Sequence, residues 1–119
     1  MSTEVSWHVE LAVRPGCLDP FVALTAEMVA ATRQERGALS YQRFVSDDGA
    51  RVDVYERYAD SAAAFAHLAN FVRVFGERYA ALVERRNFTV FGAPSGELRA
   101  MLDRFGSVYL KPLGDIAYW

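Results

Sequence analysis

The spacing of apolar residues changes along this chain between the period of two that is typical of a strand and the helical period of 3.6. The first segment has an apolar side chain at every second position, namely Val5, Trp7, Val9, Leu11 and Val13. This pattern predicts a strand with one buried face, which Pro15-Gly16 ends. Such changes of period predict strands and helices that bury their apolar sides against each other.

A helix is predicted after this first strand. Asp19 precedes Pro20, as an N-cap residue precedes a proline at the first helical position. The residues that follow at helical spacing are Phe21, Leu24, Met28, Val29 and Thr32. Gly37 is the expected C-terminal stop of this helix.

The next two segments, residues 38–46 and 51–59, alternate again. The sequence Ser46-Asp47-Asp48-Gly49 between them is a hairpin signal. An alanine-rich second helix is expected to begin at Asp60-Ser61, with Gly76 placed to bend it or to split it in two.

Three further elements are predicted in the last third of the chain. A fourth strand is expected at about residues 86–92. Pro94-Ser95 begins a short helix that Gly106 ends. Val108-Tyr109-Leu110 then begins an irregular or extended tail.

The order β-α-β-β-α-β, followed by a C-terminal helix and tail, is the split βαβ arrangement of a ferredoxin-like fold. We therefore expect an α+β protein with a four-stranded antiparallel sheet and helices on one sheet face. The 119 residues match the length of one domain. Residues 1–119 are assigned to it, with a core at about 5–92 and the C-terminal helix and tail at 94–119. The uncovered sheet face must meet water or a partner.

Charge and cysteine content narrow the possible partners. The net charge of −2 provides no basic surface for a phosphate backbone, so nucleic acid is not an expected partner. The N-terminus lacks the basic and apolar regions of a signal peptide, and no apolar run is long enough to span a membrane. The single cysteine, Cys17, cannot form an internal disulfide. We therefore expect a cytoplasmic protein that does not enter membranes.

Several motifs for cofactors and nucleophiles are missing from the sequence. It has no Gly-x-Gly-x-x-Gly and no P-loop lysine. Its two histidines are expected on opposite sides of the sheet, which argues against a histidine-rich metal site. Cys17 has no evident base beside it and is interpreted as a packing residue. If the chain is an enzyme, we expect it to need neither a metal nor an organic cofactor.

Alternation sorts the strand residues onto two faces. The face expected beneath the helices carries Trp7, Val9, Leu11, Val13, Leu39, Tyr41, Arg43, Val45, Val52, Val54, Glu56 and Tyr58. The opposite face is expected to carry His8, Glu10, Gln42, Phe44, Asp53, Tyr55, Arg57, Thr89 and Phe91. This second set mixes aromatic side chains with opposite charges, as the core of an interface does. We interpret it as a homodimer interface; the alternative is a monomer that exposes a few aromatics.

Two charged residues, Glu56 and Arg43, fall on the face expected beneath the helices. A buried carboxylate is costly unless it is paired or hydrogen-bonded. His67 projects toward it from the covering helix, and the expected surrounding aromatics are Trp7, Tyr41, Tyr58, Phe65, Phe71 and Phe75. Such a pocket fits a flat phenolic molecule. The alternative is that Glu56 caps a helix or pairs with an arginine, and that His67 packs at a helix edge.

Three short motifs occur in a recognisable order: Gly37-Ala38-Leu39-Ser40-Tyr41-Gln42, Val54-Tyr55-Glu56-Arg57-Tyr58, and Asp60-Ser61 through Ala66-His67-Leu68. Over roughly residues 5–92 the chain resembles the antibiotic biosynthesis monooxygenase family. Ala38 and Tyr58 stand where the family usually has cysteine and tryptophan. The resemblance implies a ferredoxin-like monomer, a dimeric α/β barrel closed through the uncovered sheet face, and one cavity in each monomer.

Members of this family include cofactor-independent oxygenases that convert anthrones, naphthols or hydroquinones to quinones. The resemblance therefore implies a small aromatic substrate such as a phenol, O₂ as co-substrate, and no cofactor. Glu56 and His67 match the family's motif positions and are the acid–base candidates, with Tyr58 as a third catalytic candidate. The substrate-binding candidates are Trp7, Tyr41, Arg43, Phe65, Phe71 and Phe75.

Two other functions stay open at the level of sequence. One is a non-catalytic dimer that binds a small ligand, and the other is an isomerase or cyclase of polyketide-like intermediates with the same acid–base pair. Related haem-degrading enzymes use a strand-one asparagine, a cavity tryptophan and a histidine late in the second helix. This chain has Val9 and Tyr58 at the first two positions and no histidine after His67. Haem degradation is therefore not expected.

Overall fold

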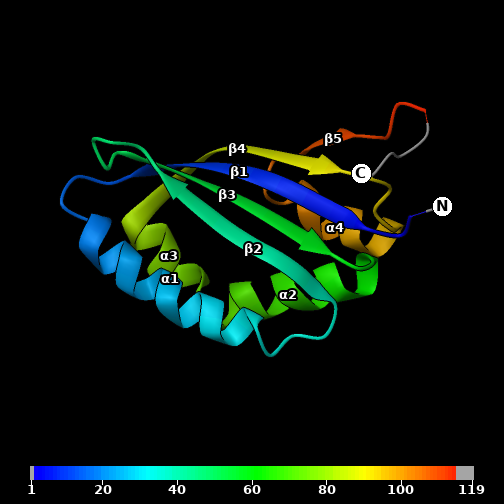
Figure 1. Ribbon diagram of the computed structural model, residues 1–119, viewed down its shortest axis with the longest axis horizontal. Coiled ribbons are helices and arrows are strands. Elements are labelled where there is room, and N and C mark those ends of the chain that lie inside the picture. Colours follow the sequence, from blue (N-terminus) through cyan, green and yellow to red (C-terminus); the bar gives the residue numbers. More distant parts are fainter. Residues whose placement is uncertain (1, 115–119) are drawn as a thin grey trace.

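The computed structural model describes residues 2–114 and contains a five-stranded sheet with helices on one side (Figure 1). The strands are β1 (Val5–Val13), β2 (Ala38–Val45), β3 (Arg51–Tyr58), β4 (Val83–Phe91) and β5 (Val108–Leu110). The helices are α1 (Leu18–Thr32), α2 (Ser61–Val74), α3 (Gly76–Leu82) and α4 (Gly96–Asp103). The last part of the predicted tail, residues 115–119, lies outside the described residues.

The strand order is β2-β3-β1-β4-β5. The first four strands pair antiparallel, which confirms the predicted ferredoxin-like α+β fold. The fifth strand was not predicted, because the sequence indicated only an irregular or extended tail there. β5 runs parallel to β4, with Thr89 opposite Val108, and α4 forms the crossover that a parallel pair requires. The sheet is therefore mixed and is not closed.

The boundaries of α1 differ from the prediction at both ends. Asp19 is not the N-cap, because the helix begins at Leu18 and Cys17 takes the cap position. Pro20 lies in the first turn, where its missing N–H is not needed. At the other end α1 stops at Thr32 and is followed by short turns, with the Glu35 N–H donating to the Thr32 carbonyl at 3.0 Å. Gly37 is therefore not the helix stop.

The predicted starts of the other helices and the break at Gly76 are confirmed, whereas α4 ends at Asp103, so Gly106 is not its stop. Asp60 caps α2 by accepting a hydrogen bond from the Ala63 N–H at 2.9 Å. The second predicted helix is split at Gly76 into α2 and α3. Ser95 caps α4 by accepting from the Leu98 N–H at 3.2 Å. Such polar side chains satisfy amides that the first helical turn leaves unpaired.

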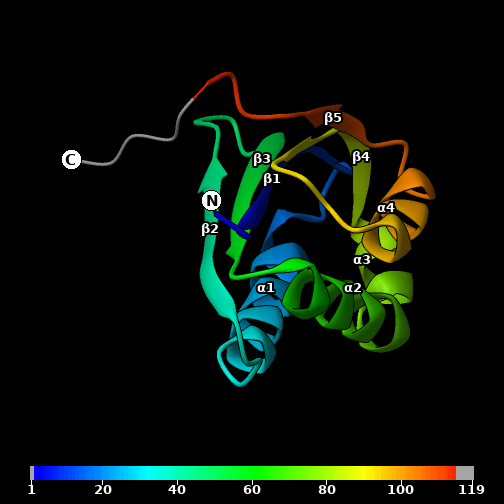
Figure 2. The same ribbon diagram turned by 90° about the vertical axis from the view of Figure 1, so that its right-hand side faces the viewer.

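The strand registers confirm most of the predicted face assignment. Trp7 lies opposite Glu56, and Tyr41 lies opposite the same glutamate on the other side, and opposed residues share a face. Figure 2 shows the helices gathered beneath that face. The largest fully buried side chains are Trp7, Tyr58, Phe21, Leu11, Leu98, Leu102, Val5 and Val90. The core thus lies between the sheet and the helices, next to Glu56.

Three of the predicted inward residues on β2, Leu39, Arg43 and Val45, are exposed. Leu39 is 51% exposed and Val45 is 58% exposed. The register shifts between Ala38 and Ser40, so Leu39 is the extra residue of a bulge and leaves the alternation. Val45 is the last residue of the edge strand, next to the hairpin turn. The face prediction was therefore wrong for Leu39, whereas Arg43 and Val45 lie opposite the buried Val54 and Val52 and keep the predicted face, although both are exposed.

The opposite sheet face carries the predicted mixture of charges and aromatics. His8 Nε2 lies 2.7 Å from Asp53 Oδ2, and Arg51 pairs with both Asp53 at 2.7 Å and Glu10 at 3.2 Å. Phe44 is 60% exposed on the same face. Within residues 2–114, no helix combines the length and the apolar character needed to cross a membrane.

Candidate active site

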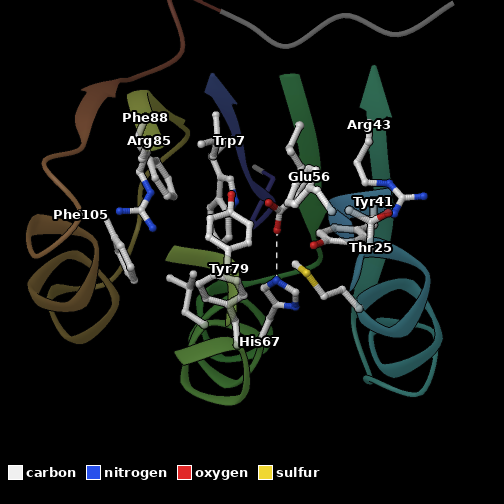
Figure 3. Close-up of a pocket in the computed structure, with 16 residues that line it drawn as sticks. Trp7, Thr25, Tyr41, Arg43, Glu56, His67, Tyr79, Arg85, Phe88 and Phe105 are labelled. Carbon is white, nitrogen blue, oxygen red and sulfur yellow. Dashed lines mark ion pairs between the residues drawn. The ribbon is translucent and has the colours of Figure 1, made fainter. Parts of the chain in front are cut away.

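A narrow cavity lies between the sheet and helices α1, α2 and α3 (Figure 3). Its volume is about 30 Å³, which is room for about two water molecules. Most of the lining side chains are apolar or aromatic. The charged or histidine side chains in the lining are Arg43, Glu56, His67 and Arg85. A small set of polar groups in an apolar enclosure is the usual composition of a ligand site.

Glu56 faces this cavity from β3 and is nearly fully buried. Its Oε1 accepts a hydrogen bond from the Tyr58 hydroxyl at 2.6 Å and lies 3.1 Å from Nε2 of His67. Among residues 2–114 no group donates a hydrogen bond to its Oε2. One carboxylate oxygen is therefore held in place, while the other can accept a hydrogen bond from a molecule in the cavity.

His67 lies on α2 and is bound at both ring nitrogens. Nδ1 is 2.7 Å from Oε1 of Glu35, and Nε2 contacts Glu56. Burial alone lowers the pKa of His67, but its hydrogen bonds with Glu35 and Glu56 outweigh that effect and raise the pKa to about 9. At neutral pH the imidazole is therefore protonated and donates from both nitrogens.

Glu35 was not predicted as a site residue. It lies in the turn after α1, and the close approach of this turn to α2 brings it against His67. Gly37 permits the approach, because a Cβ there would lie 2.6 Å from Cβ of Ala63 and its φ is +84°. Glu35 belongs to a polar run with no apolar period, so only its position two residues before a glycine could have marked it.

Arg85 was also missed, because the fourth strand was predicted to begin at about residue 86. If the alternation that begins at Val90 and Phe88 continued without a break, the side chains of residues 86 and 84 would face the helices. The register instead shifts between Glu10 and Leu11 of β1, so Leu11 lies opposite Arg85. This bulge turns Arg85 into the cavity, where its guanidinium lies 4.7 Å from the ring centroid of Phe105.

The structure brings most of the predicted site residues together. Trp7, Tyr41, Arg43, Glu56, His67 and Phe71 all line the cavity. Phe75 lines a smaller adjoining cavity together with Glu35. Tyr58 and Phe65 line neither of the two. Tyr58 instead lies behind Glu56 and contacts His67, with ring centroids 4.9 Å apart.

The tyrosines near Glu56 are held in their neutral form. Burial and the Glu56 carboxylate raise the pKa of Tyr58, and the same two causes raise the pKa of Tyr41. Figure 3 places Glu56, His67 and Tyr41 near the middle of the cavity, with Arg43 on one side and Arg85 on the other. Within residues 2–114 no group of three or more His, Cys, Asp or Glu side chains is placed to hold a metal ion.

These features define a ferredoxin-like α+β protein with an enclosed acid–base site between the sheet and the helices. The model of the antibiotic biosynthesis monooxygenase family matches residues 5–85. The chain therefore belongs to the antibiotic biosynthesis monooxygenase family. A search of curated proteins finds no match.

Solved structures with the same fold include MupZ from Pseudomonas fluorescens, with a TM-score of 0.87 and 20% identity over 99% of this chain and 91% of that one. SnoaB, a cofactor-independent oxygenase from Streptomyces nogalater, has a TM-score of 0.68 and 18% identity over 79% of this chain and 96% of its own. Rv0793 from Mycobacterium tuberculosis is 28% identical with a TM-score of 0.57, over 77% of this chain and 96% of its own.

Proposed function

We propose that the protein is a cofactor-independent monooxygenase that oxidises a small phenol, anthrone or hydroquinone to a quinone with O₂. The observation that carries this proposal is the free Oε2 of Glu56, aimed into a narrow aromatic cavity. Membership of the family and the fold shared with SnoaB, a cofactor-independent oxygenase, support it. A positioned carboxylate in a dry, aromatic enclosure suits the removal of a proton from an activated aromatic substrate.

The reaction begins with proton transfer from the substrate hydroxyl or acidic carbon to Glu56. The resulting electron-rich anion passes one electron to O₂, and the two radicals combine to form a carbon–peroxide bond. A proton then returns to the distal peroxide oxygen, the O–O bond breaks, and water leaves. The substrate carbon loses its second hydrogen and becomes the quinone carbonyl. For a CH₂ group the balance is CH₂ plus O₂ giving C=O plus H₂O.

The charges around the cavity favour the anionic intermediate. Protonated His67 contacts Glu56, and Arg43 and Arg85 line the cavity on either side. Cationic donors that are already in place stabilise negative charge as it develops on oxygen. An aromatic ring does not fit into about 30 Å³, so side chains at the cavity wall must move when substrate enters. Phe105 is half-buried, Arg43 is exposed, and both border the cavity.

The same proposal includes a homodimer that packs through the uncovered sheet face. This face carries the aromatic side chains of Phe44, Tyr55 and Phe91. The ring centroids of Tyr55 and Phe91 are 6.5 Å apart. The ion pairs around Asp53 satisfy the polar groups between them. Aromatic side chains surrounded by paired charges are typical of a surface that a partner covers in a complex.

The test is oxygen uptake by chelator-treated protein against a panel of anthrones, naphthols and hydroquinones. Glu56→Gln keeps the shape of the side chain but cannot take a proton, so we expect turnover to fall by about 10²-fold or more. Glu97→Gln, an exposed change on α4, is the matched control and should retain full turnover. Uptake that Glu56→Gln leaves unchanged contradicts the assignment of the base. No uptake above the protein-free rate favours a binding protein or an isomerase.

A further inference from the structure

We propose that Glu35 is the outer member of a proton relay: when Glu56 takes the substrate proton, His67 gives its Nδ1 proton to Glu35, and Glu35 releases it to solvent. This inference rests on the proposed function for the substrate proton that Glu56 takes. Its structural basis is that His67 contacts a different carboxylate at each ring nitrogen, 3.1 Å from Glu56 and 2.7 Å from Glu35.

Glu35 is the most exposed of the three contacting side chains. Glu56 and His67 side chains are 9% and 6% exposed, and the Glu35 side chain is 15% exposed. Glu35 also borders a second small cavity, whose lining shares Thr32 and Tyr41 with a groove at the surface. A proton that reaches Glu35 is therefore nearer to water than one on Glu56. The active-site cavity itself can stay dry.

The relay leaves the proton on Nε2 in place throughout. When Glu56 has taken the substrate proton, its negative charge no longer holds the second proton on His67, so Nδ1 gives that proton to Glu35 and Glu35 releases it to water. When Glu56 later returns its proton to the peroxide, Nδ1 takes a proton back from water through Glu35. The site is then again a charged imidazole between two carboxylates.

A purely structural role for Glu35 predicts different behaviour from a relay. If Glu35 only orients the imidazole, then Glu35→Gln should act like the parent protein, because the amide oxygen can still accept from Nδ1. If Glu35 carries the proton, then Glu35→Gln blocks the path although the geometry is kept. Glu35→Ala removes the acceptor and leaves space that a small carboxylic acid can occupy.

The first experiment uses a substrate that the protein oxidises and measures its turnover in weak buffer. We expect kcat of Glu35→Gln to fall about tenfold or more with KM within about twofold, while Glu97→Gln is unchanged. Added formate should restore kcat of Glu35→Ala in proportion to its concentration and should leave the parent protein unaffected. Normal kcat in Glu35→Gln, or a loss in Glu35→Ala that formate does not repair, overturns the relay.

A second experiment does not depend on oxygen chemistry. 4-Nitrophenol is mixed with the protein below the pH at which the free phenol ionises, so its visible absorption reports anion formation in the cavity. A pH indicator in weak buffer reports proton release. Release should follow anion formation in the parent protein and be slowed about tenfold or more in Glu35→Gln. Equal release rates, or no anion in the parent protein, overturn the relay. A normal relay without oxygen uptake overturns only the oxygenase function.

Discussion

The hydroxyl of Tyr58 donates a hydrogen bond to Oε1 of Glu56 across 2.6 Å. The two residues are separated by one position on β3, so the pleat of the strand points both side chains to the covered face. A buried carboxylate thereby receives a donor from its own strand. Since a tryptophan cannot offer a hydroxyl, this arrangement depends on the residue that departs from the usual family pattern.

Tyr58→Phe should destabilise the protein and leave the fold intact. The change removes a donor from a buried charged acceptor, and such hydrogen bonds contribute about 1.5–3 kcal/mol. Tyr55→Phe on the same strand is the control, because Tyr55 lies on the other face and is partly exposed. Urea unfolding followed by circular dichroism gives both free energies. Equal stabilities of the two variants would contradict a structural role for the Tyr58 hydroxyl.

Stability should depend on pH through His67, whose pKa is raised to about 9 from an ordinary value of 6.5. A raised pKa means that the folded state holds the proton more tightly than the unfolded chain. The stabilisation is complete below about pH 6.5 and is lost as the pH rises through about 9. The stability difference between the parent protein and His67→Gln should therefore shrink by at most roughly 3 kcal/mol over this range.

Urea unfolding of both proteins at several pH values provides the measurement. His67→Gln cannot hold a charge, so it reports every other group that titrates over the same range. A difference that stays constant, or that grows as the pH rises, would mean that His67 is neutral in the folded protein. Titration of the His67 ring signals by NMR gives the same pKa independently.

Much of the fold follows from the sequence because the apolar period and the capping residues are local signals. Alternation on β1 and on β3 assigned Trp7 and Glu56 to the covered face correctly. Asp60 and Gly76 marked the start of α2 and the break before α3. Each of these features depends only on neighbours along the chain, and the two strand patterns are long enough to be unambiguous.

The parts of the site that could not be predicted depend on contacts between distant segments. Arg85 enters the cavity because a bulge opposite β1 reverses the alternation of β4. Glu35 reaches His67 because Gly37 packs against Ala63 of α2. A bulge, or the packing of a loop against a helix, leaves no pattern in the spacing of apolar residues along a single segment. The same reason explains the wrong assignment of Leu39.

Arg85→Met should reduce kcat/KM by about 10²-fold, because it removes a cationic donor from the cavity while keeping a long apolar side chain. Arg86→Met is the matched control, since the bulge leaves that neighbour exposed outside the cavity. Oxygen uptake with the best substrate of the panel gives both values. If both variants retain activity, or both lose it equally, the guanidinium of Arg85 has no specific part in the reaction.

Phe44→Glu should convert the proposed dimer into a monomer, because it introduces unpaired negative charges at an interface centre. Val72→Glu is the control: Val72 is also exposed, but it lies on α2, away from the uncovered sheet face. Light scattering coupled to gel filtration gives the mass of each variant. A parent protein that is monomeric, or a Phe44→Glu variant that stays dimeric, would argue against packing through this face.

Gly37→Ala should destabilise the protein by about 1–3 kcal/mol, since two separate penalties arise at this position. The φ of +84° disfavours any side chain, and the new Cβ would lie 2.6 Å from Cβ of Ala63. Combining it with Ala63→Gly removes the steric contact, and the Ala63→Gly single variant measures the separate cost of about 1 kcal/mol of placing glycine in α2. In the single variant the turn must move away from α2, so the bond between Glu35 and His67 should lengthen and the pKa of His67 should fall. Urea unfolding and NMR titration of the single and double variants separate the two penalties, and an unchanged His67 pKa in Gly37→Ala would show that Glu35 is positioned without this glycine.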